Sequence, residues 1–70
     1  MKELKTIIKN ELRDNENIFI TTSNKLNDLN NSEWWHLDEY MANQIFDTYT
    51  GKEKVVRFWH EDGLCIILKQ

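Results

Sequence analysis

Residues 54–69 read KVVRFWHEDGLCIILK, in which two apolar runs flank the sequence Glu61-Asp62-Gly63. An Asp-Gly pair between apolar runs favours a β-hairpin, because both residues accept the positive φ angles of a tight turn. The pattern therefore predicts strands at residues 54–60 and 64–69. With Asp62 and Gly63 as the two turn residues, the expected cross-strand pairs are His60 with Cys65, Trp59 with Ile66, and Phe58 with Ile67.

The second run of this hairpin, Leu64–Leu68, is apolar on both faces, which is typical of a central strand. Residues 18–22 are β-branched or aromatic and predict a further strand. With helices at residues 2–13 and 33–48, the chain order becomes α-β-α-β-β. We expect an α+β fold: a single domain over residues 1–70, with a three-stranded, mostly antiparallel sheet in the order 1-3-2 and two helices packed on it.

Both helices are predicted from apolar residues at the three-and-four spacing that places side chains on one face. In the second helix this stripe consists of Trp34, Leu37, Met41, Ile45 and Tyr49. Ser32 suits the N-cap and Gly51 the C-cap. Asp38 falls inside the apolar arc, so its carboxylate would need a partner such as Arg57. Residues 23–32 contain four Asn and predict a loop.

The size and composition describe a small globular chain. Seventy residues suffice for one domain, and the single cysteine, Cys65, forms no internal disulfide, which suits a reducing compartment. The longest apolar run has five residues, far below the roughly 20 of a membrane-spanning helix. The N-terminal residues have no signal-peptide core. We therefore expect a cytoplasmic protein.

Charge is distributed unevenly along the chain. Residues 26–51 carry five acids and no Lys or Arg, whereas the flanking segments are close to neutral. Such a segment repels phosphates, so direct nucleic-acid binding and membrane binding are not expected of it. It would attract a partner protein with a basic surface. The alternative is a solvated acidic helix face without a binding role.

The candidate partner-binding residues lie on the polar side of the predicted second helix and on its aromatic flanks. They are Glu33, Trp35, His36, Glu39, Tyr40, Asn43 and Asp47. Interfaces are enriched in Trp and Tyr, which often carry much of the binding energy. The alternative for the two adjacent tryptophans is burial in the core.

Catalysis is not expected from this sequence. His36, His60 and Cys65 lack the paired spacing of a structural zinc site, so no metal and no cofactor is predicted. A cysteine within an apolar strand is typically buried and inert. Neither of the two glycines belongs to a phosphate-binding loop.

Three functions are consistent with these patterns. The first is a small acidic inhibitor or regulator that occupies a basic, nucleic-acid-binding surface of another protein, its acids standing in for phosphates as in a DNA mimic. The second is a self-associating homodimer without enzymatic activity, and the third is a small metal-dependent enzyme or sensor. Frequent Asn, Lys and Ile, with no Pro, are typical of an AT-rich genome, which suits a phage or mobile-element accessory protein.

Overall fold

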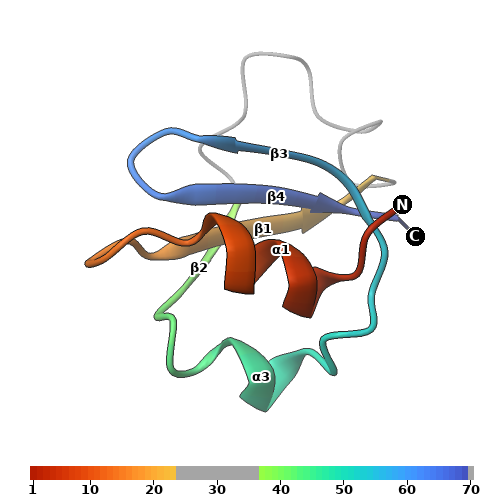
Figure 1. The fold of residues 1–70 in the computed structure, drawn as a ribbon, viewed down its shortest axis with the longest axis horizontal. Coiled ribbons are helices and arrows are strands. Elements are labelled where there is room, and N and C mark those ends of the chain that lie inside the picture. The colour runs from red at the N-terminus through yellow and green to blue at the C-terminus, as the bar shows by residue number, and fades with distance from the viewer. Residues whose placement is uncertain (24–36, 70) are drawn as a thin grey trace.

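The computed structural model describes residues 1–23 and 37–69, which form an α+β structure, as the sequence predicts (Figure 1). The elements in chain order are α1 (Leu4–Glu11), β1 (Ile18–Thr22), β2 (Asp38–Tyr40), α3 (Ile45–Thr48), β3 (Val55–His60) and β4 (Leu64–Leu68). The predicted loop at residues 23–32 lies outside the described residues from residue 24 onward, as does the start of the predicted second helix, residues 33–36.

Within residues 1–23 and 37–69 the sheet has four strands in the order β2-β1-β4-β3, which corrects the predicted three-stranded sheet and its order. The difference is β2, which adds to the free side of β1. β4 runs parallel to β1 and antiparallel to β3, so the sheet is mixed. All five residues of β4 are buried, as expected for a strand that is apolar on both faces and has a neighbour on each side.

The predicted helix over residues 33–48 is wrong in its described part. Asp38–Tyr40 form a strand antiparallel to β1, and only Ile45–Thr48 are helical. In a helix Asp38 would have pointed into the apolar arc, whereas on this edge strand it is exposed. Met41, a member of the predicted stripe, is 54% exposed. A short helix depends on tertiary packing, and pairing with β1 satisfies the backbone of residues 38–40 instead.

The core lies between the sheet and the two helices, which both lie below the sheet in Figure 1. α1 contributes Leu4, Ile7 and Ile8, and α3 contributes Ile45. α1 is shorter than the predicted 2–13, because Glu3 forms an antiparallel bridge with Lys54 and the chain leaves the helix at Leu12. No helix in the described ranges is long and apolar enough to cross a membrane.

The hairpin register differs by one residue from the prediction. His60 pairs with Leu64 and Trp59 with Cys65, so the loop has three residues, 61–63. Asp62 has φ 58° and Gly63 has φ 148°. A Cβ on Gly63 would lie 2.6 Å from the carbonyl oxygen of Asn17, so the chain needs glycine at this close approach.

The register determines which side chains share a face of the sheet. His60 lies on the same face as its partner Leu64, and Cys65, the next residue along the strand, points to the other face. The two-residue turn would have placed His60 beside Cys65 on one face. The observed hairpin therefore separates two of the three side chains from which a metal or catalytic site was drawn.

Candidate functional site

The outer strand β2 carries exposed acids at one edge of the sheet. Asp38 and Glu39 are both exposed. Asp38 pairs with Ile20 and lies on the core side, whereas Glu39 pairs with Phe19 and lies on the opposite side. Because successive side chains of a strand alternate, the two carboxylates border the edge from both faces of the sheet.

Tyr40 anchors this edge to the core. Its ring meets that of Tyr49 edge-to-face, with 5.6 Å between the ring centroids, and both residues pack against the buried core. Burial, a hydrogen bond with Tyr40 and the carboxylates of Asp38 and Glu53 raise the pKa of Tyr49 to about 12. Tyr49 therefore stays neutral at physiological pH.

Glu39 is fixed by the chain that leads into β1. The side-chain amide of Asn17 donates a hydrogen bond to Oε2 of Glu39 at 2.8 Å. The carbonyl of Asn17 in turn accepts the backbone amide of Leu64 at 2.9 Å. The orientation of the Glu39 carboxylate is thus tied to the middle of the sheet.

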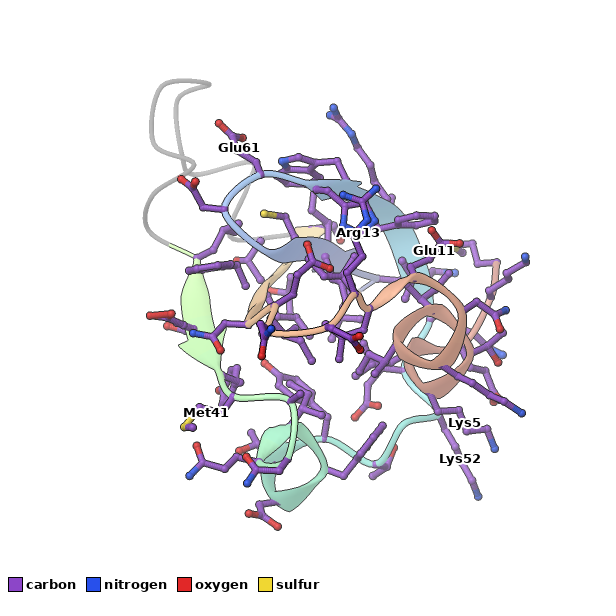
Figure 2. All side chains as sticks on the ribbon, turned by 60° about the vertical axis from the view of Figure 1, so that its left-hand side comes forward. Lys5, Glu11, Arg13, Met41, Lys52 and Glu61 are labelled. Atoms are coloured by element: carbon purple, nitrogen blue, oxygen red, sulfur yellow. The ribbon has the colours of Figure 1, made fainter. Side chains whose placement is uncertain are left out.

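The acidic character continues past β2 into α3. Met41 follows the strand and is exposed (Figure 2), and Asp47 is exposed on α3. From residue 37 to residue 51 the chain contains no Lys or Arg. We call Asp38, Glu39, Met41 and Asp47 the acidic edge; it combines three carboxylates with one flexible apolar side chain.

The predicted partner-binding residues do not share a helix face. Glu39 and Tyr40 lie on β2, Asn43 in the following turn, and Asp47 on α3. Tyr40 is half-buried against Tyr49 rather than flanking a polar face. Glu33, Trp35 and His36 lie outside the described residues. Glu39 and Asp47 are exposed, and their role in binding a partner stays a prediction.

A second polar cluster joins three segments that are far apart in the sequence. Nδ1 of His60 lies 3.0 Å from Oε2 of Glu16, and Nε2 lies 3.9 Å from Oε1 of Glu11. Glu16 also accepts the backbone amide of Arg13 at 2.7 Å. The hydrogen bond with His60, followed by that from Arg13, lowers the pKa of Glu16. The cluster ties the end of α1 and the approach to β1 to the end of β3.

This cluster could not be predicted from the sequence, since no local motif links Glu11 and Glu16 to His60. Within residues 1–23 and 37–69, no group of three His, Cys, Asp or Glu side chains is placed to hold a metal ion. The contacts of His60 with Glu16 and Glu11 link α1, the approach to β1 and β3.

Cys65 is 4% exposed, which confirms that it is buried, as predicted. Its Sγ lies 3.4 Å from the carbonyl oxygen of Glu61. Burial, the largest influence, raises the pKa of the Cys65 thiol, and nearby carboxylates act in the same direction. Since a nucleophilic cysteine needs the thiolate, this environment favours an inert thiol.

Comparison of the chain with protein-family models, with curated proteins and with solved structures finds no match. The acidic edge combines exposed carboxylates, of which that of Glu39 is held by Asn17, with one exposed methionine.

Proposed function

We propose that the protein acts by binding, and that its acidic edge docks onto a basic surface of another protein and blocks or regulates it. The observation that carries this proposal is the placement of Asp38 and Glu39 at the outer strand of the sheet, in a stretch without Lys or Arg. Neighbouring carboxylates on a rigid strand attract a basic protein surface over several ångströms and repel an acidic surface.

Two further features support a docking role. The carboxylate of Glu39 is held by Asn17, so part of the ordering that binding requires is already present in the free protein. Met41 offers an adaptable apolar contact, and methionine is common on surfaces that bind other proteins. Charges of the acidic edge would guide association, and Met41 would add contact area after docking.

The partner class that fits best is a protein that normally binds nucleic acid. Such proteins expose clustered Lys and Arg for phosphates, and carboxylates can occupy the same positions. An accessory protein of a phage or mobile element that inhibits a host protein in this manner would need no catalytic residues.

The test compares two variants that each remove two negative charges. Asp38→Asn/Glu39→Gln alters the acidic edge, and the Gln side chain keeps an oxygen that accepts the bond from Asn17. The matched control, Glu61→Gln/Asp62→Asn, alters two exposed acids of the hairpin loop. Gln at position 61 can still accept the Trp59 indole, and Asn tolerates the positive φ at position 62.

Each variant is immobilised and challenged with an oligolysine peptide and with proteins from a host lysate. We expect salt-sensitive binding that the edge variant loses and the control keeps, because position rather than net charge determines docking. Equal loss in both variants, or binding unaffected by either, would contradict the proposal. Circular dichroism of both variants verifies that the fold is intact.

A further inference from the structure

The fold brings together three segments that carry five lysines, at residues 2–5, 52–54 and 69. Backbone hydrogen bonds join the N-terminal residues to residues 51–55, through the amide of Leu4 to the carbonyl of Glu53 and the amide of Lys5 to that of Gly51. The amide of Lys69 binds the carbonyl of Lys54 at 2.8 Å. We call the resulting group the lysine cluster; its members are Lys2, Lys5, Lys52, Lys54 and Lys69.

Positive charge is in excess within this cluster. Glu3 is shared, with Oε1 3.7 Å from Nζ of Lys5 and Oε2 3.8 Å from Nζ of Lys54. The carboxylate of Glu53 instead accepts the backbone amides of Thr50 and Gly51, at 2.9 and 2.8 Å. Burial alone would raise the pKa of Glu53, but these hydrogen bonds lower it. The Glu53 carboxylate therefore holds the loop at residues 50–51 in place.

The other three lysines of the cluster have no ion pair among the described residues. They are Lys2, Lys52 and Lys69, and all three are exposed. The cluster also has exposed apolar neighbours, since Met1 is 69% and Val56 50% exposed. The lysine cluster therefore resembles the acidic edge in combining charged side chains with exposed apolar ones, but its charge has the opposite sign.

In Figure 2, Lys5 and Lys52 of the lysine cluster extend together on one side of the molecule, and Met41 of the acidic edge lies on the other side. One molecule thus cannot bring its own surfaces together. A small anion is a poorer occupant of the lysine cluster than a protein. The first-turn amides of α1 that would bind one already donate to the carbonyls of Glu3, Gly51 and Glu53.

We propose that the lysine cluster of one copy docks onto the acidic edge of a second copy. The occupant is chosen by charge complementarity. Within residues 1–23 and 37–69, three lysines of the cluster form no ion pair with a carboxylate, and the three carboxylates of the edge form none with a base. The proposal shares the acidic edge with the proposed function and in that respect rests on it. Its new element is the lysine cluster as a second binding surface.

This contact is heterologous, because two different surfaces meet. Each dimer then retains one free acidic edge and one free lysine cluster, so association continues beyond the dimer unless a ring closes. A basic partner protein would compete with the neighbouring copy for the acidic edge. Self-association would in that case hold the protein in a reserve form that a partner dissociates.

The first experiment is sedimentation velocity of the full chain over a range of concentrations. We expect an average mass that increases with concentration past that of a dimer at low salt. Association should weaken about tenfold or more between about 50 mM and about 500 mM NaCl, since surface charges are screened. A strict monomer at millimolar concentration, or association that salt does not change, would overturn the proposal.

The second experiment uses two variants, each of which replaces charged side chains of one surface with neutral ones. Lys2→Gln/Lys52→Gln/Lys69→Gln disables the lysine cluster and leaves the Glu3 ion pairs in place. Asp38→Asn/Glu39→Gln disables the acidic edge. We expect each variant alone to be monomeric and an equal mixture to form a one-to-one heterodimer that grows no further. Self-association of either variant alone at wild-type strength would refute head-to-tail docking.

The same variants separate this proposal from the proposed function. The lysine variant should lose self-association and still bind the oligolysine peptide, whereas the edge variant should lose both. If the wild type binds the peptide but never self-associates, the inference about the second copy fails and the proposed function stands. If the wild type self-associates but does not bind the peptide, the proposed function fails and the inference about the second copy stands.

Discussion

Replacing Gly63 with alanine should destabilise the protein more than the same replacement at Gly51. Gly63 has φ 148°, and a Cβ there would lie 2.6 Å from the carbonyl oxygen of Asn17 and 2.7 Å from the ring of Phe19. The backbone oxygen cannot rotate away as a side chain can. Relief therefore requires the chain at Asn17 to separate from β4, which breaks the 2.9 Å bond from the amide of Leu64.

The magnitude follows from these two effects. A non-glycine residue held in a sparsely populated φ region costs about 1–3 kcal/mol. Loss of one backbone hydrogen bond adds about 1 kcal/mol. We therefore expect Gly63→Ala to lower the free energy of unfolding by about 2–4 kcal/mol, a large share of the stability of a domain this small. The melting temperature should fall by about 10–25 °C.

Gly51→Ala is the matched comparison. Gly51 also has a positive φ, 94°, but the added Cβ would lie 3.1 Å from two side-chain atoms, Cβ of Lys5 and Cε1 of Phe46. The Phe46 side chain is 51% exposed and can move. Backbone strain at the positive φ is then the main effect, and we expect Gly51→Ala to lower the free energy of unfolding by about 1–2 kcal/mol. Urea unfolding followed by tryptophan fluorescence measures both. A loss for Gly63→Ala that is equal to or smaller than that for Gly51→Ala would refute the reasoning.

Three further predictions concern the core and the titratable groups. Ile45→Ala should destabilise the protein by about 2–5 kcal/mol in urea unfolding, because Ile45 is fully buried and joins α3 to the core. The lowered pKa of Glu16 stabilises the fold at pH values above the unfolded pKa near 4.5, and this contribution is lost as pH falls through the lower folded pKa. The drop in melting temperature on acidification should therefore be smaller in Glu16→Gln than in wild type. The thiol of Cys65 should react with iodoacetamide far more slowly in the native protein than in urea, because it is buried and its pKa is raised.

The sheet could be predicted where the decisive signals are local. β1 matches the predicted residues 18–22, and Leu64–Leu68 lies between two strands because neither face carries a polar residue. The register of the hairpin between β3 and β4 could not be predicted, because Asp62-Gly63 fits both a two-residue turn and a three-residue loop. The choice depends on the approach of Gly63 to Asn17, a residue 46 positions earlier in the chain.

The helical period at residues 34–49 predicted a helix because the apolar spacing there matches 3.6 residues per turn. Pairing with β1 overrode it, and the sign was already present in Asp38, which no amphipathic helix would place inward. The exposure of Glu39 and Asp47 could be anticipated, since carboxylates are seldom buried. The lysine cluster could not, because residues 2–5, 52–54 and 69 meet only in the folded chain.

Acids on an outer strand have two physical effects that predict opposite results. Charged side chains at a sheet edge prevent unwanted pairing with another strand, and on that account alone neutralising Asp38 and Glu39 would increase self-association. If the same carboxylates receive the lysine cluster of a second copy, neutralising them decreases it. The edge of β2 spans three residues, a short template for strand pairing, whereas three exposed lysines that pair with no carboxylate of the described residues offer a sizeable opposite charge. We therefore expect Asp38→Asn/Glu39→Gln to lower the average mass in sedimentation, and an increase would assign these acids to edge protection instead of docking.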